Sequence, residues 1–167
     1  MKLTNCVYSI LRSRTVPLIL SLGASSVGVV SSGRSLPLPE RMLSADRVVV
    51  AMASSVTAEW RQNQYGDRLI VSRIVLEVEE ALKGSAEARV FMDLEGGTLD
   101  GLTLRVSDLP QVHAGERGVF LLDRAGSTHV PHERGLGILK LDPADRDRLQ
   151  GSSLRLADVR RMARGER

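Results

Sequence analysis

Residues 73–85 read RIVLEVEEALKGS, and this stretch fits two different secondary structures. As a helix it would place Ile74, Val78 and Leu82 on one apolar stripe. As a strand it would place Ile74, Leu76 and Val78 on one face, with charged residues on the other. The two alternatives lead to different folds, so the residues around the stretch have to decide between them.

The residues that precede this stretch favour a strand. The apolar alternation begins at Arg68, and residues 70–78 are rich in β-branched side chains, which are favoured in strands over helices. Residues 62–67, QNQYGD, come just before and are typical of a hairpin turn. We therefore predict a strand from Arg68 to about Glu79, followed by a tight or one-turn helical exit. Gly84 would end that exit in a left-handed conformation.

Further strands follow the same alternation. The first is expected after residue 46, with a core face formed by even-numbered residues: Val48, Val50, Met52, Val56, Ala58 and Trp60. Others are expected at residues 88–95, 102–106, 117–124 and 135–142, with turn residues between them. Successive strands joined by short turns predict a mainly β fold, a small five- to six-stranded Greek-key (OB-like) barrel.

Helices are expected after the barrel. Asp142 and Pro143 match an N-cap followed by a proline at the first helical position. The end of the chain is amphipathic, with Leu156, Val159 and Met162 on one face. The sequence therefore predicts a barrel at residues 47–142 and a short C-terminal helical tail at residues 143–167.

Residues 1–33 have the order of a secretory signal peptide. A basic segment without acidic residues is followed by residues 15–33, which are uncharged and end in small residues. A retained membrane anchor is the alternative, but this apolar stretch is shorter than the ~20 residues that spans usually need. We expect cleavage between Val27 and Arg34 and a periplasmic or secreted protein with no membrane span after cleavage. Residues 34–46 would then be a spacer and lead-in turn.

Charge and cysteine content exclude several classes of function. The chain carries 23 basic and 20 acidic residues, and three of the basic ones, but no acidic one, lie in residues 1–33. Residues 34–167 are therefore neutral, whereas a nucleic-acid-binding surface needs a basic stripe. The one cysteine, Cys6, also lies in the first segment. The mature domain therefore has no disulfide, thiolate nucleophile or cysteine metal ligand.

Several motifs resemble a group of exported bacterial proteins of largely unassigned function. They are SADRVVVAMASSV at residues 44–56, RLIVSRIVLEVEEALKG at 68–84, GGTLDGLTLRVSD at 96–108 and PxxxxGER at 110–117, in a region of similarity over 44–141. The first two strands are also similar to the netrin-like module found in tissue inhibitors of metalloproteinases. The residues that carry this second similarity are Ala45, Asp46, Val48, Val50, Leu76, Val78, Lys83 and Gly84.

The netrin-like resemblance implies an OB-type barrel whose function is binding. In those inhibitors an N-terminal cysteine presents its amine and carbonyl to the zinc of the protease. Residues 34–167 contain no cysteine. The resemblance therefore implies the fold and a binding partner rather than that inhibitory mechanism.

The candidate catalytic chemistry centres on His129, His132 and Glu133. Two imidazoles and a carboxylate can bind zinc, so a metal-dependent hydrolase that uses this loop is the alternative function. Pro131 excludes the helical H-x-x-x-H arrangement of zinc proteases. His113 is expected in a loop, and the chain has no G-x-S-x-G elbow for a Ser-His-Asp site. The sequence thus predicts no catalytic residue, no metal site and no cofactor.

Trp60 and Tyr65 flank the first predicted hairpin turn, beside polar residues at positions 62–64, a composition suited to partner contact. Core packing or a lid over the surface is the alternative role for these aromatic side chains. Single-stranded nucleic acid would need more aromatic residues in a basic groove. We therefore expect an exported module that is not an enzyme. Its partner would be an envelope or secreted protein, with a protease among the candidates.

Overall fold

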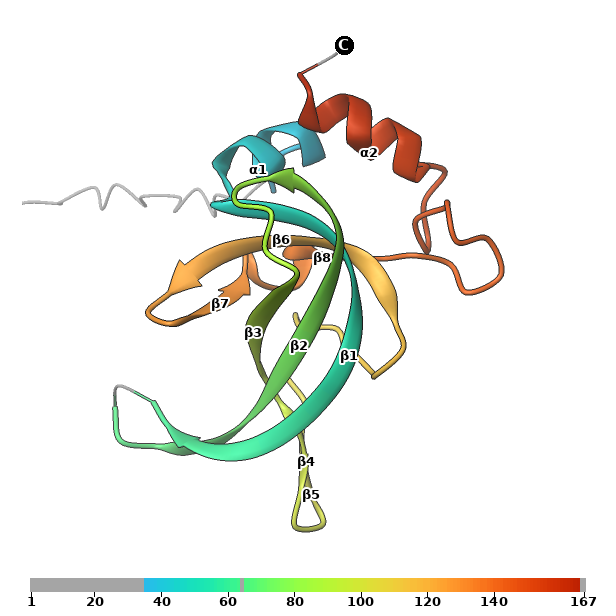
Figure 1. The fold of residues 1–167 in the computed structure, drawn as a ribbon. Coiled ribbons are helices and arrows are strands. Elements are labelled where there is room, and N and C mark those ends of the chain that lie inside the picture. The colour runs from blue at the N-terminus through green and yellow to red at the C-terminus, as the bar shows by residue number, and fades with distance from the viewer. Residues whose placement is uncertain (1–34, 64, 166–167) are drawn as a thin grey trace, which may run out of the picture. The chain divides into compact units, whose positions relative to one another are not determined.

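The computed structural model describes residues 35–63 and 65–165; the predicted signal peptide at residues 1–33 and Gln64 lie outside the described residues. The elements labelled in Figure 1 are α1 (Leu38–Ser44), β1 (Arg47–Gln62), β2 (Arg68–Lys83), β3 (Arg89–Glu95), β4 (Gly97–Leu99), β5 (Leu102–Leu104), β6 (Arg117–Ala125), β7 (Thr128–Pro131), η1 (Arg134–Gly137), β8 (Ile138–Lys140) and α2 (Leu156–Ala163).

A closed ring of strands forms the barrel (Figure 1). β1 pairs antiparallel with β2 on one side and with β6 on the other, β2 pairs with β3, and β6 pairs with β7. β7 runs parallel to β3 and closes the ring at the pair Met92 and His129. β8 pairs with β6 as a further strand, and β4 and β5 form a separate hairpin. The prediction of a mainly β, OB-like Greek-key barrel is confirmed, and one of the two helices, α2, lies near the C-terminus.

Residues 73–83 belong to β2, so the strand predicted there is confirmed and the helical exit is wrong. β2 continues to its end because it pairs with the start of β1, where Lys83 lies opposite Val48. Lys83 Nζ also donates hydrogen bonds to the carbonyl oxygens of Leu43 and Ala45, at 2.5 and 2.6 Å, which joins the end of the strand to α1. Gly84 has a φ of +92°, the left-handed conformation predicted for it.

The first half of β1 buries both of its faces. Odd-numbered residues from Val49 to Ala53 pack inside the barrel, whereas even-numbered ones such as Val48 pack outward into a second core. A register shift between Ala53 and Ser55 reverses this alternation, and Val56 then packs against the barrel interior. The predicted core face of even-numbered residues is therefore correct for the barrel interior only beyond this bulge.

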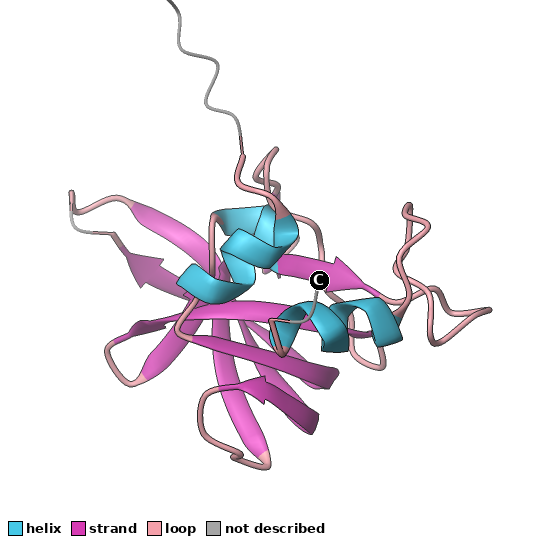
Figure 2. Ribbon diagram, turned by 90° about the horizontal axis from the view of Figure 1, so that it is seen from above, coloured by secondary structure: helices cyan, strands magenta, loops and turns pink. Residues whose placement is uncertain are grey.

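The two helices build the second core on the outside of the barrel. α1 carries Pro39 in its first turn, where no N–H partner is needed, so part of the spacer and lead-in turn predicted at residues 34–46 is helical. α2 begins where the Asp158 carboxylate accepts a hydrogen bond from the Arg155 backbone N–H at 2.9 Å. Met42 and Leu156 pack in this core. The helices lie beside each other over one end of the barrel (Figure 2). Among the described residues, no helix has the length and apolar character of a membrane span.

The helix predicted at Asp142 and Pro143 is wrong, because residues 142–155 form successive turns. The Asp142 carboxylate accepts hydrogen bonds from the backbone N–H of Ala144 at 2.9 Å and from the Arg148 side chain at 2.7 Å. This local bonding by Asp competes with helix formation. The turns bring Leu149 into the second core, where it is 3% exposed.

The strand predicted at residues 135–142 is correct only for β8. The short 3₁₀ helix η1 precedes β8 and contains Gly135 and Gly137. Both glycines lie too close to other backbone atoms to carry a side chain. A Cβ built on Gly135 would lie 2.0 Å from the Asp108 carbonyl oxygen, and one on Gly137 would lie 2.4 Å from that of His132. The glycines therefore allow a close turn that the apolar alternation could not reveal.

Candidate functional site

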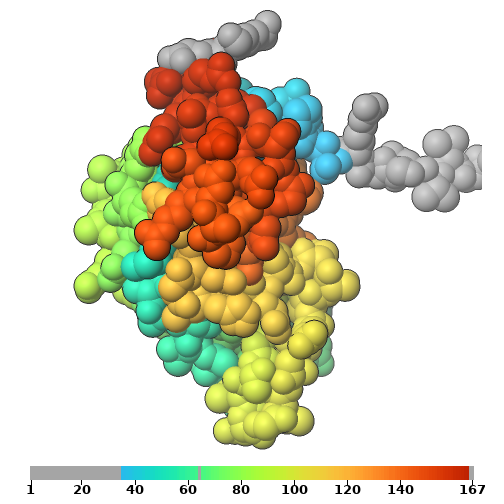
Figure 3. All heavy atoms as spheres, turned by 90° about the vertical axis from the view of Figure 1, so that its right-hand side faces the viewer, coloured from blue at the N-terminus to red at the C-terminus, as the bar shows by residue number. Residues whose placement is uncertain are grey.

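The distal half of the β1–β2 hairpin projects from the barrel. β1 pairs with β6 only from Arg47 to Met52, and two backbone hydrogen bonds at Ala53 extend that contact by one residue. From Ser55 to Gln62, β1 pairs only with β2 among the residues that the structure describes. Figure 1 shows this part sweeping away from the helices, and Figure 3 shows the β4–β5 hairpin (yellow-green) protruding at the same end. A surface remote from the helices is therefore available for contact.

Trp60 lies on this projecting part and is held by its neighbours. Its indole N–H donates to the Asp100 carboxylate, with 3.2 Å between the heavy atoms. The guanidinium carbon of Arg68 lies 4.8 Å from the centre of the ring, in a cation–π arrangement. The side chain remains 36% exposed. Trp60 thus joins the hairpin to the β4–β5 turn and remains partly exposed to solvent.

Tyr65 is the most exposed aromatic residue of the described chain, at 80%. It lies in the hairpin turn, which the Asn63 side chain organises by accepting hydrogen bonds from the backbone N–H groups of Tyr65 and Asp67, both at 2.9 Å. Gln64, which the sequence placed beside it, lies outside the described residues. The described residues of the turn therefore present an aromatic ring to solvent.

The convex face of the hairpin carries an ion-pair network. Asp93 of β3 is 7% exposed and accepts hydrogen bonds from Arg61 at 2.6 Å and from Arg73 at 3.2 Å. Arg61 also pairs with Glu59. A buried carboxylate needs such partners. The two arginines, one on β1 and one on β2, therefore serve to hold these strands to Asp93 of β3.

A groove of about 740 Å³ opens beside the projecting part of β1. Val56 and Ala58 of β1 contribute to one wall, and the connection from Leu104 to Ala114 contributes to the other. Both apolar and polar residues line it. The volume lies within the roughly 300–1,000 Å³ of typical ligand sites.

The three residues of the predicted metal loop point to different surroundings. His129 Nδ1 lies 3.3 Å from the Phe91 carbonyl oxygen, whereas His132 binds Asp123 and Ser44. Glu133 has a φ of +47°, and its Oε2 atom is buried without a hydrogen-bond partner among the described residues. Within residues 35–63 and 65–165, no group of three or more His, Cys, Asp or Glu side chains has metal-binding geometry. The structure does not bring these three residues together as a metal site.

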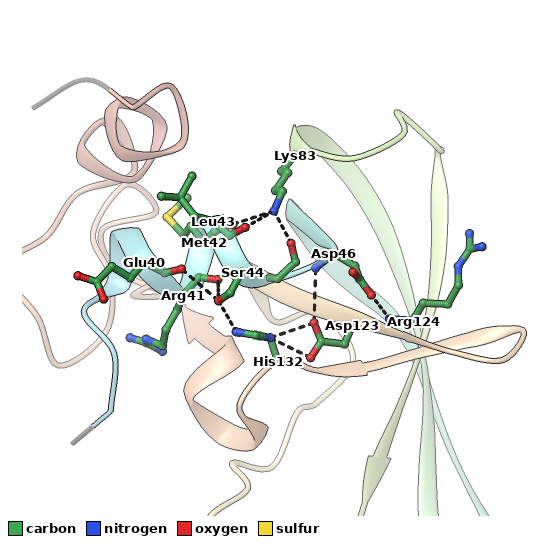
Figure 4. Close-up of polar contacts among 11 residues, drawn as sticks. Glu40, Arg41, Met42, Leu43, Ser44, Asp46, Lys83, Asp123, Arg124 and His132 are labelled. Carbon is green, nitrogen blue, oxygen red and sulfur yellow. Dashed lines mark hydrogen bonds and ion pairs between the residues drawn. The ribbon is translucent and has the colours of Figure 1, made fainter. Parts of the chain in front are cut away.

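His132 instead forms a hydroxyl–imidazole–carboxylate chain (Figure 4). Its Nδ1 atom lies 2.8 Å from Asp123 Oδ2, and its Nε2 atom lies 2.9 Å from Ser44 Oγ. Such spacing is that of a nucleophile, a base and an orienting carboxylate. These hydrogen bonds could not be predicted from the sequence, because Asp123 and His132 lie 79 and 88 positions after Ser44. No local motif marks the three residues as partners.

The same atoms also fasten α1 to the barrel. Ser44 Oγ lies 3.1 Å from the carbonyl oxygens of both Glu40 and Arg41, which accept the hydroxyl proton when the imidazole N–H faces the oxygen. Asp123 additionally accepts from the Asp46 backbone N–H at 3.4 Å, and Asp46 accepts from the Arg124 backbone N–H at 2.9 Å. These contacts connect the end of α1, the start of β1 and β6, as Figure 4 shows.

A buried arginine secures the connection between β2 and β3. Arg47 is 5% exposed, and its guanidinium donates to Glu87 at 2.7 Å and to Ser85. Hydrogen bonds from Arg47 and Ser85 lower the pKa of Glu87 to about 2. A smaller cleft beside Arg47 also touches Arg124 and His129. Glu87 thus pairs with the Nη2 side of the buried guanidinium, whereas the Nη1 atom of Arg47 is buried without a hydrogen-bond partner among the described residues.

No protein-family model matches the chain, and no curated protein matches it significantly. The structure defines the class, a small OB-like Greek-key barrel with two helices against its outer face. Because one fold supports many functions, the function has to be argued from the sites described above.

Proposed function

We propose that this chain is an exported, non-catalytic interaction module that binds an envelope or secreted protein. The observation that carries the proposal is the projecting β1–β2 hairpin, whose turn exposes 80% of Tyr65 while Trp60 stays partly exposed below it. Tyr and Trp are the residues that most often anchor protein interfaces. The neutral charge of residues 34–167 favours a protein over a nucleic acid as the partner.

The remaining parts of the proposal rest on the sequence. The order of residues 1–33 supports export, and the resemblance to netrin-like inhibitors supports a binding function, with a secreted or envelope protease among the candidate partners. The Lys83 contacts with α1 agree with a structural role for one residue of that resemblance. The partner would approach the end of the barrel that lies away from the helices.

Replacement of both Trp60 and Tyr65 by Ala is expected to weaken capture of the partner by at least ~10-fold, since interface aromatics are the usual energetic anchors. The measurement is affinity capture from envelope extract with the chain that begins at Arg34, quantified by immunoblot of the captured protein. The variant with His129→Ala and His132→Ala should weaken capture less.

Phe91→Ala is the matched control for this experiment. Phe91 is also an exposed aromatic residue, at 46%, but it lies on β3 and not on the projecting hairpin. Its loss should leave capture unchanged. Equal weakening by Phe91→Ala and by the hairpin double variant would contradict the assignment of the contact to the hairpin.

Hydrolysis is the second candidate function, and the Ser44–His132–Asp123 chain is the observation that favours it. The groove of 740 Å³ includes none of these three side chains. Ser44 also has two helix carbonyl oxygens within hydrogen-bonding distance of its hydroxyl. The contacts of Ser44, His132 and Asp123 are therefore better explained as holding α1 against the barrel than as a substrate site.

Ser44→Ala separates these two roles. If the contacts fasten α1, this variant should lose about 1 kcal/mol of stability, a fall of roughly 4 °C in Tm, with capture of the partner unchanged. The measurements are a thermal melt and the hydrolysis of p-nitrophenyl esters. Ester hydrolysis by the unaltered chain that disappears in Ser44→Ala without a change in Tm would assign the site to an enzyme instead.

A further inference from the structure

We infer that the free edge of β1 between Val56 and Gln62 binds an extended peptide by strand addition, and that Arg105 pairs with an acidic side chain of this peptide. The inference rests on the proposed function, because it specifies how the projecting hairpin holds its protein partner. It differs from that proposal in assigning the main contact to backbone groups and a groove, and not to the aromatic side chains alone.

The hydrogen-bonding direction of β1 follows from contacts on the far side of β2. Ile70 accepts a backbone hydrogen bond from Gly96 at 2.8 Å, so its N–H and C=O point away from β1. Trp60 is the residue opposite Ile70. In an antiparallel pair, if the N–H and C=O of one residue point away from the neighbouring strand, those of the residue opposite also point away from their neighbour. The N–H and C=O of Trp60 therefore face the free edge.

The same alternation assigns the neighbouring residues. Val56, Ala58 and Gln62 lie at every second position from Trp60, and no register shift interrupts β1 between Ser55 and Gln62. Their N–H and C=O groups thus face the free edge too. No backbone hydrogen bond joins this edge to another segment of residues 35–63 or 65–165. Unpaired strand edges are the sites where extended peptides add.

The edge also lacks charged protection directed at an incoming strand. Glu59 and Arg61 lie on the convex face and are engaged with each other and with Asp93. The bulge that protects many edges lies at Ser54, before the free part begins. A peptide could therefore pair along the whole stretch from Val56 to Gln62.

The groove supplies the side-chain contacts. Val56 and Ala58 are among its lining residues, so a peptide bound to their backbone would lie beside it. Leu109, which is partly buried and also lines the groove, offers apolar contact to side chains of such a peptide.

The charges of the groove identify the preferred peptide. Of the ionic side chains that line it, Lys140 pairs with Glu116 at 2.8 Å, and Glu95 pairs with Arg134 at 3.1 Å. Arg105 is exposed and makes no ion pair or hydrogen bond with any described residue. A carboxylate on the peptide would give Arg105 an ion-pair partner.

Two labelled heptapeptides test the inference directly. Both alternate Thr and Val, and the central residue is Glu in one and Lys in the other. Fluorescence anisotropy should show that the Glu peptide binds more tightly. Arg105→Glu should weaken the Glu peptide at least tenfold and reverse the preference. Arg146→Glu, which changes an exposed arginine outside the groove, should alter neither affinity by more than twofold.

Backbone pairing is tested on the peptide and on the protein separately. N-methylation at alternate positions of the Glu peptide should abolish binding in one of the two alternations and spare it in the other. Ala58→Pro should abolish binding as well. The Ala58 N–H faces the free edge, where proline is tolerated, so the thermal melt should stay close to that of the unaltered chain. The methylated peptides decide the matter even if the proline variant does not fold.

Several outcomes would overturn the inference. One is equal binding of both methylated sets, and another is no binding of either peptide. A dimer that dissociates in Ala58→Pro would show that a second copy occupies the edge. Peptide binding by the chain that begins at Arg34 but not by the full chain would show that residues 1–33 occupy it.

The outcome also separates this inference from the proposed function. Partner capture that depends on Trp60 and Tyr65, without any effect of Ala58→Pro or of the peptides, would leave the interaction module standing and refute strand addition. Peptide binding with the expected alternation, together with capture that is indifferent to the two aromatic residues, would support strand addition and refute the hairpin contact as proposed.

Discussion

Ile74→Asp is expected to leave the domain largely unfolded at 25 °C. Ile74 is fully buried in the barrel interior, in the same cluster as Leu76, Met92 and Phe120. An unpaired carboxylate in such surroundings costs several kcal/mol, and the apolar contacts of the isoleucine are lost as well. The total stability of a domain is only about 5–15 kcal/mol. Loss of the cooperative transition in far-UV circular dichroism would be the result.

Val75→Asp is the matched control, because it places the same carboxylate one residue further along β2. Val75 is half-buried on the opposite face of the strand, so the new charge keeps access to water. This variant should remain folded with a lower Tm. Similar stability of the two variants in urea would show that the assigned interior face of β2 is incorrect.

Gly137→Ala is expected to lower stability by about 3 kcal/mol. The added Cβ would lie 2.4 Å from the carbonyl oxygen of His132 and 2.8 Å from that of Leu121, both backbone atoms. These groups cannot move apart easily, since the His132 N–H donates to the Leu121 carbonyl at 2.9 Å. Inserting an atom into close-packed backbone therefore requires β6 and η1 to shift.

Gly101→Ala separates this steric effect from backbone strain. Gly101 has a φ of +77° and no atom within 4 Å of a Cβ built on it. The substitution should therefore cost only about 1 kcal/mol, from the left-handed conformation alone. Urea denaturation of both variants measures the difference. An equal loss in both would mean that the turn at Gly137 is looser than described.

The alternation of side chains predicted the strands well because it depends on local burial. Residues 73–79 form a strand as the flanking residues indicated, whereas residues 80–83 continue the strand in place of the expected exit. The bulge near Ser54 was beyond such reasoning, since it exchanges the buried faces of β1 without any change in composition. The residues after Asp142 form turns because the Arg148 side chain bonds the Asp142 carboxylate and Leu149 packs in the second core. These contacts outweigh the favourable N-cap sequence at Asp142.

The candidate sites were predicted less completely than the fold. Trp60 and Tyr65 lie on the hairpin as the turn signal indicated. The link between Ser44, Asp123 and His132 joins segments that only the closed barrel brings together. The free edge of β1 could not be seen either, because the length of its pairing with β6 depends on where β6 begins, at Arg117.

The length of β1 gives the molecule two separated poles. Its 16 residues correspond to roughly 50 Å of chain at ~3.3 Å per residue. α1 and α2 lie beside each other near its beginning, and the hairpin turn follows its end. The strand thus serves as an internal spacer. A surface or fusion partner joined to the helices would therefore lie at the pole opposite the hairpin turn and leave that turn accessible.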